Sequence, residues 1–174
     1  MRTKTRIAGW LLLIFSLVVL TGCHRLVIPA MTRAEKIALR SFHGRYVTAL
    51  GEGEGWSLKQ SPGPELSDCE WFTQYNLANG KIALETCHGR FVTAPRRGTT
   101  RFDWEVWQES GLGDCGQFVR QKLGEDRVAF ITCAGKYLTA GNDGPGWEPP
   151  LQWAIVAETS ELKDWEIFTV LRQR

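Results

Sequence analysis

The segment IALETCHGRFVTA at residues 82–94 has two closely similar copies in the chain, IALRSFHGRYVTA at 37–49 and VAFITCAGKYLTA at 128–140. The copies start 45 and 46 residues apart. Repetition at a period of about 20–50 residues is typical of folds in which similar structural units pack against one another. The segment therefore predicts an architecture of three similar units.

A second motif recurs near the end of each unit. It reads DCEWF at 68–72, DCGQF at 114–118 and DWEIF at 164–168, so its copies start 46 and 50 residues apart. The 138 residues from 37 onwards equal three units of 46. We therefore expect one repeat domain, with these boundaries: domain 37–174, repeats 37–81, 82–127 and 128–174.

Each unit reads as a series of short β-strands. Ile-Ala-Leu and Tyr-Val-Thr-Ala are apolar and β-branched runs joined across a glycine, which suits a tight turn. A third run follows at 56–60, 104–108 and 152–157, and a fourth run carries the Phe of the second motif. Four strands per unit, with no convincing amphipathic helix, indicate a closed or capped all-β fold. The repeated apolar positions are its expected core: Ile37, Leu39, Val47, Phe72, Ile82, Leu84, Val92, Phe118, Val128, Phe130, Leu138 and Phe168.

The two motifs together resemble those of fascin and other fascin-like β-trefoils. The shared pattern is Gly-Arg/Lys-Tyr/Phe-Val/Leu-Thr-Ala paired with Trp-Glu-x-Phe, and it covers roughly residues 36–174. The segment at 165–168 keeps the family's aromatic pair, whereas Cys69 and Cys115 stand where the first two units would carry the Trp. The resemblance implies a β-trefoil with three four-stranded repeats of about 46 residues.

The N-terminus has the features of an export signal. Three cations, Arg2, Lys4 and Arg6, precede an apolar run at 7–20 that is short for a helix crossing ~30 Å of hydrocarbon. Leu-Thr-Gly-Cys at 20–23 resembles the lipobox of bacterial lipoproteins, which implies cleavage before Cys23 and acylation of its thiol, for example with palmitate. The alternatives are an ordinary secretory peptide and an uncleaved signal anchor.

We therefore predict a helical signal peptide at 1–22, a tether at 23–36 and a lipid-anchored, extracytoplasmic domain in a bacterial cell envelope. Removal of the signal changes the formal charge from +2 to −1, because 18 Lys and Arg then face 19 Asp and Glu. A near-neutral chain without a basic patch does not favour a polyanion, so nucleic acid is not an expected partner.

Four cysteines remain beyond Cys23, and an even number in an exported domain points to disulfides. Because the repeat makes two positions equivalent to two others, the predicted bridges are Cys69–Cys87 and Cys115–Cys133. The alternative use of four cysteines is a zinc site, but the sequence lacks the Cys-x-x-Cys spacing that would support one.

Strand geometry gives a second reason for this pairing. A hairpin centred near Ala78 places position 69 opposite 87, and one centred on Gly124 places 115 opposite 133. Directly opposite residues have Cβ atoms about 4.5–5.5 Å apart, which a disulfide can span. In the third unit the equivalent positions are Trp165 and Phe42, whose rings are expected to meet in place of a bridge.

No catalytic arrangement emerges from the sequence. His43 and His88 are equivalent residues in hairpin turns, and no motif brings a nucleophile to either of them. The recurring Asp68, Asp114 and Asp164 are separated by the threefold repeat and read as turn residues. Asn142 and Asp143 offer two oxygens, too few for a calcium site. We predict no enzyme activity, no metal and no cofactor.

Tryptophan is the unusual component, with eight in the chain. Aromatic faces suit sugar rings and protein surfaces, so the candidate ligand-binding residues are Trp147, Trp153, Trp56 and Trp104. The structural alternative is that Trp56 and Trp104 cap the floor of the fold. We expect a membrane-anchored module that binds a glycan or a protein surface. The alternatives are actin binding, which resemblance to fascin implies, and a protein-interaction or inhibitor role. The oligomeric state is not predicted.

Overall fold

The computed structural model describes residues 31–63, 65–98 and 101–173. The predicted signal peptide, Cys23 and most of the predicted tether lie outside these residues. Among the described residues no α-helix occurs, and no helix is long and apolar enough to cross a membrane. The strands are β1 Met31–Arg40, β2 Tyr46–Ala49, β3 Leu58–Ser61, β4 Trp71–Leu77, β5 Ile82–Glu85, β6 Phe91–Thr93, β7 Trp107–Glu109, β8 Val119–Lys122, β9 Arg127–Ile131, β10 Tyr137–Ala140, β11 Ile155–Thr159 and β12 Phe168–Arg172. The short 3₁₀ helices are η1 Glu52–Glu54, η2 Asp68–Glu70, η3 Arg101–Trp104, η4 Asp114–Gly116 and η5 Asp164–Glu166.

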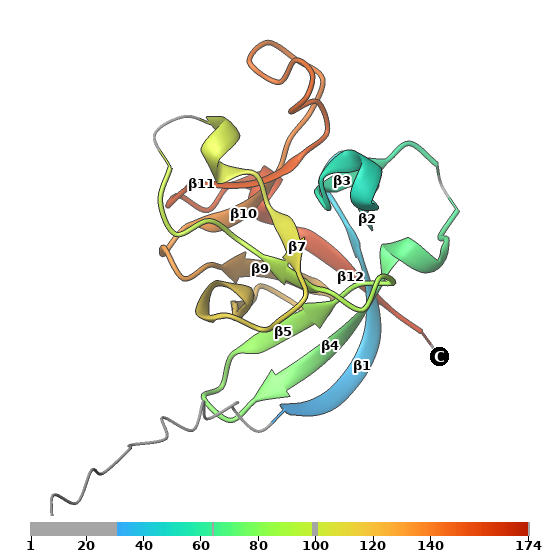
Figure 1. Cartoon of the computed structure of the whole chain (residues 1–174), viewed down its shortest axis with the longest axis vertical. Helices are drawn as coiled ribbons and strands as arrows, with labels where there is room; N and C mark the ends of the chain where they lie inside the picture. Colours follow the sequence, from blue (N-terminus) through green and yellow to red (C-terminus); the bar gives the residue numbers. More distant parts are fainter. Residues whose placement is uncertain (1–30, 64, 99–100, 174) are drawn as a thin grey trace, which may run out of the picture.

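Six strands close into an antiparallel barrel (Figure 1). β1 pairs with β4 and β12, β4 with β5, and β9 with β8 and β12. β5 and β8 complete the ring at one bridge, where the backbone amides and carbonyls of Ile82 and Phe118 exchange two hydrogen bonds of 2.9 Å. The same apolar pairing recurs as Ile37 opposite Phe72 and as Val128 opposite Phe168.

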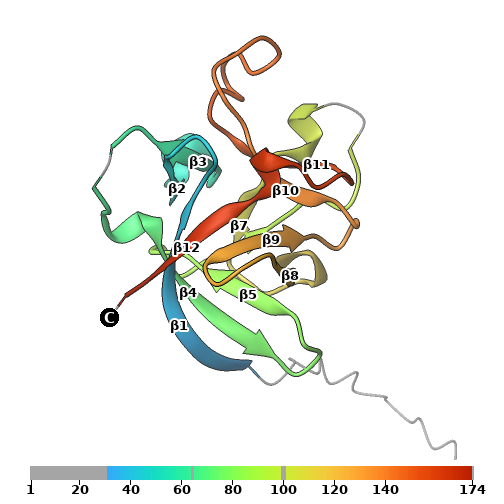
Figure 2. The same cartoon turned by 180° about the vertical axis from the view of Figure 1, so that it is seen from behind.

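The other six strands form three hairpins, β2–β3, β6–β7 and β10–β11, which cover one end of the barrel (Figure 2). Their backbones meet there: the Leu58 amide donates to the Val106 carbonyl at 3.1 Å, and the Val106 amide donates to Ile155 at 2.9 Å. These contacts close a cap over the apolar interior.

The core lies inside this capped barrel. Every one of the twelve predicted core residues is at most 5% exposed. Their side chains alternate with outward-facing residues along the strands, as in Tyr46–Ala49, where buried and partly exposed positions alternate. The inward positions of the repeat were therefore predicted correctly.

Two boundaries differ from the sequence prediction. β1 begins at Met31, inside the predicted tether, because its first residues pair with the far end of β4 as far as Leu77. The third run of each unit begins as a strand later than predicted. Trp56 and Trp153 there have φ angles of 58° and 60°, a left-handed conformation that a strand cannot contain.

Both predicted disulfides are present, with sulfur–sulfur distances of 2.07 Å for Cys69–Cys87 and 2.01 Å for Cys115–Cys133. The predicted strand geometry is wrong, however. In the β4–β5 register the residue opposite position 87 is Trp71, because Thr73 pairs with Glu85. Cys69 lies in η2 just before the strand, and this tight turn carries its sulfur back to Cys87.

In the third unit, the predicted contact between the rings of Trp165 and Phe42 is replaced by other ring contacts of Trp165. The Trp165 ring contacts His43 at 5.3 Å and Trp147 at 6.2 Å, both edge to face. Phe42 is 59% exposed, and the ring contact recorded for it is with His43. An aromatic contact thus joins the third unit to the first, through the imidazole.

Candidate functional site

The hairpin turns with the sequence His-Gly-Arg join neighbouring units. Nε2 of His43 lies 3.1 Å from the carbonyl oxygen of Ala140, and Nε2 of His88 lies 3.2 Å from that of Ala49. When Nε2 carries the proton, each imidazole donates a hydrogen bond to the preceding unit in the ring. Both histidines therefore have a structural partner.

Three of the four tryptophans proposed as ligand contacts lie beneath a cation from the next hairpin turn. The charged group lies above the ring centroid at 3.8 Å in Arg45–Trp153, 3.9 Å in Arg90–Trp56 and 5.9 Å in Lys136–Trp104. A cation this close occupies one face of the indole and holds two units together. Each of these rings therefore contacts a cation of a neighbouring unit.

The fourth tryptophan, Trp147, is 4% exposed and lies in a small apolar cluster. The loop packs so tightly that a Cβ built on Gly141 would lie 2.3 Å from its ring. Its indole supports the rings of Trp104 and Trp165 from behind. Trp147 therefore offers no face to a ligand in this conformation.

Trp165 does line an open groove. The groove has a volume of about 440 Å³ and lies between the β10–β11 hairpin and η5. Besides Trp165, its walls carry hydroxyl, carboxyl and ammonium groups from Thr139, Glu158, Thr159, Lys163, Asp164 and Glu166. We refer to it as the Trp165 groove.

A buried hydrogen bond stabilises η5, which forms one wall of the groove. The buried carboxylate of Glu166 accepts a hydrogen bond of 2.9 Å from the Lys163 amide, so this residue serves the turn. Lys163 in turn pairs with Glu161 at 2.8 Å on the exposed surface, and its hydrogen bond to the Glu161 carboxylate raises the pKa of the Lys163 ammonium. Asp164 is exposed at the edge of the groove.

One buried polar atom in the groove has no partner among the described residues. Oγ1 of Thr139 is buried and makes no hydrogen bond there, although the residue is 3% exposed and lines the groove. An unsatisfied buried hydroxyl costs about 1–3 kcal/mol. A ligand hydroxyl that reached Thr139 would remove this cost.

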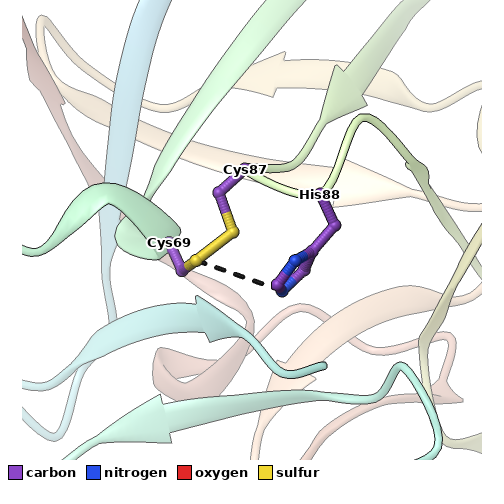
Figure 3. Close-up of side chains that lie close together, drawn as sticks. All are labelled: Cys69, Cys87 and His88. Carbon is purple, nitrogen blue, oxygen red and sulfur yellow. Dashed lines mark hydrogen bonds between the residues drawn. A yellow bond between two sulfur atoms is a disulfide. The ribbon is translucent and has the colours of Figure 1, made fainter. Parts of the chain in front are cut away.

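Three potential metal ligands lie close together, but two of them, Cys69 and Cys87, form a disulfide. The sulfurs of Cys69 and Cys87 lie close to Nε2 of His88, with Cys69 Sγ 4.0 Å from that nitrogen (Figure 3). Because a disulfide removes both thiolates, the trio cannot hold a metal while the bridge is intact. The bridge and imidazole instead tie the first unit to the second.

The recurring acids each begin a 3₁₀ turn. Asp68, Asp114 and Asp164 are the first residues of η2, η4 and η5, as the sequence predicted for turn residues. They stand at three separate places around the barrel, and Asp114 pairs with Arg96 at 3.3 Å on the surface.

Comparison with solved structures places the architecture in a known fold class. The structure described as SeviL bound to asialo-GM1 saccharide has a TM-score of 0.62 at 12% identity, covering 82% of this chain and 100% of that chain. The designed threefold-symmetric protein ThreeFoil has a TM-score of 0.63 at 17% identity, covering 78% and 97%. No family model and no curated protein matches the sequence. The likeness shows the fold, a β-trefoil; the fascin-like resemblance stays a prediction.

The sequence prediction and the Trp165 groove share the third unit, but they name different side chains. It marked the long loop of the third unit, whose Trp147 supports the groove from behind. Trp165 was assigned to the family's aromatic pair, and Thr139 belongs to the repeated Thr-Ala end of a strand. The available signal was asymmetry, because Trp165 replaces the two cysteines at its equivalent positions.

Proposed function

We propose that this β-trefoil is a non-enzymatic module that binds a neutral face of a glycan in the Trp165 groove. The observation that carries the proposal is an open groove in which a partly exposed indole lies beside the carboxylates of Glu158 and Asp164 and a buried hydroxyl without a partner among the described residues. A sugar ring presents an apolar C–H face together with hydroxyl groups, and this combination matches an aromatic wall with a few fixed polar groups. The saccharide bound to the structurally similar SeviL supports the class of ligand.

We further propose that the domain comprises three four-stranded repeats and is held outside the cytoplasm by a lipid on Cys23. With β1 starting at Met31, the eight residues 23–30 span at most roughly 28 Å. The start of β1 and the β10–β11 hairpin lie toward opposite ends of the molecule (Figures 1 and 2). A short tether at the first end leaves the groove facing away from the membrane.

A glycan array tests the function. The full chain, expressed in a bacterial envelope and purified in mild detergent, is expected to bind a defined set of oligosaccharides. Thr139→Val and Glu158→Gln are each expected to weaken that binding about five-fold, since one hydrogen bond contributes roughly 1 kcal/mol. Thr48→Val changes the residue of the first unit that corresponds to Thr139, and Glu109→Gln changes a carboxylate on the corresponding strand of the second unit; both serve as controls.

Two outcomes would refute the proposal. One is an array without any bound glycan, in which case co-sedimentation with actin becomes the informative assay for the fascin-like alternative. The other is equal loss of binding in the control variants.

For the anchor, Cys23→Ser is expected to move the chain from the detergent phase to the aqueous phase, and an unchanged partition would contradict lipidation.

A further inference from the structure

A row of outward-facing side chains crosses three neighbouring barrel strands, β1, β12 and β9. Thr169 in the centre pairs with Arg40 on one side and with Arg127 on the other. All three residues are exposed. Residues directly opposite each other on antiparallel strands have Cβ atoms about 4.5–5.5 Å apart, so two guanidinium side chains start about 10 Å apart with a hydroxyl between them.

The equivalent rows in the other two units have a different character. In the first, Thr73 stands between Lys36 and Glu85, so that the cation faces an anion across the row. In the second, Val119 takes the place of the threonine and pairs with Ile131, so that this side of the row is apolar, while Lys81 precedes the bridged Ile82 on the other side. A cation on both sides of the threonine therefore occurs in one row of the three and does not follow from the fold.

The two arginines lack acidic partners among the described residues. Within the described part of the chain neither forms an ion pair, and the hydrogen bond recorded for Arg40 runs from Nε to the Gly44 carbonyl at 3.1 Å. Asp126, beside Arg127 in the sequence, instead pairs with Arg172. Asp164 lies at the edge of the same groove without forming an ion pair with either arginine.

The row lines a groove of about 380 Å³ on the other side of η5 from the Trp165 groove, and both grooves include Asp164. Two neighbouring residues also line this groove, the exposed Phe42 and the buried Ser41. Ser41 is 6% exposed, and its buried Oγ has no hydrogen-bond partner among the described residues. Two guanidinium groups without an ion pair among the described residues, together with the Ser41 hydroxyl, form a set of donors suited to an oxyanion.

We propose that this groove binds an anionic group, sulfate or carboxylate. We also propose that, when a glycan is bound, the groove holds an acidic substituent of that glycan. The second part rests on the proposed function, whereas the first part does not. Asp164, at the edge shared by the two grooves, is placed to accept hydroxyl groups of a sugar that spans both.

Equilibrium dialysis of the full chain against radiolabelled inorganic sulfate at low ionic strength tests the first part. One sulfate per chain is expected, with affinity at least ten-fold lower in Arg40→Gln and in Arg127→Gln. Lys36→Gln removes the equivalent cation of the first unit and is expected to change nothing. Glu85→Arg creates a second doubly cationic row and is expected to add a second bound sulfate.

The proposal fails if the two arginine variants bind sulfate as the wild type does, or if Lys36→Gln loses it equally. For the second part, oligosaccharides that differ in one sulfate or one carboxylate are compared. Tighter binding of either acidic form, lost in Arg127→Gln, supports it and identifies the group, and equal binding refutes it. Sulfate binding without any glycan binding would refute the proposed function and leave the anion site intact.

Discussion

The cation above the Trp153 ring should act as a joint between units, and its strength can be worked out from its geometry. Arg45 lies 3.8 Å from the ring centroid, and both residues are partly buried. Such a contact contributes about 0.5–1 kcal/mol when exposed and about 2 kcal/mol when desolvated. We therefore expect a coupling free energy near 1 kcal/mol. For Lys136 and Trp104, at 5.9 Å, the distance is close to the limit and the coupling should stay below about 0.5 kcal/mol.

A double-mutant cycle measures these couplings, because it subtracts the separate effects of each substitution. Arg45→Met keeps the aliphatic part of the side chain, and Trp153→Leu keeps an apolar residue at the same backbone conformation. Unfolding in urea with the disulfides intact gives the free energy of unfolding for all four proteins. The Lys136→Met and Trp104→Leu cycle is the internal comparison.

A coupling below about 0.3 kcal/mol for Arg45 and Trp153, within the usual additivity error, would refute the assignment of this tryptophan to a joint. Equal couplings in the two cycles would show that the distances do not govern them. If the joint is structural, Arg45→Met should also leave glycan binding unchanged.

Three further predictions concern stability. Cys115→Ser with Cys133→Ser opens a loop with a sequence separation of 18 and should lower the free energy of unfolding by about 3 kcal/mol in the chain-entropy model, as measured by urea unfolding; an unchanged midpoint would contradict it. Gly141→Ala places a methyl group against the Trp147 ring and should lower the melting temperature by several degrees, since overpacking costs about 1–3 kcal/mol. Burial raises the pKa of Glu105, so the folded state holds its proton more tightly and stability falls as pH rises through that pKa; Glu105→Gln should remove this fall and give a flatter profile of melting temperature against pH.

The repeat made the core and the disulfides predictable, because a residue that recurs in three units at an apolar position has to point inward in all of them. Ile37 and Phe72 illustrate this, since their pairing recurs around the barrel. The exact position of Cys69 did not follow, because a 3₁₀ turn before β4 changes which residue lies opposite Cys87. The sequence marked Asp68 as a turn residue, but not that the turn also contains Cys69.

The candidate site was harder to predict because it depends on contacts between segments that are distant in the sequence. The ring of Trp153 is covered by Arg45, which is distant in the sequence. The exposure of this ring therefore could not be predicted from the residues around Trp153. Trp165 and Thr139 line the same groove where η5 packs against β10, and this groove forms only once the third unit is folded. The arginine row similarly requires the closure of β12 against both β1 and β9.

The most direct test of the central claim is a structure of the chain with a glycan selected by the array. The claim predicts a sugar ring packed against the indole of Trp165, with a hydroxyl within hydrogen-bond distance of Thr139 Oγ1. A glycan held against Trp56 or Trp153, with the arginine displaced and the Trp165 groove empty, would contradict it.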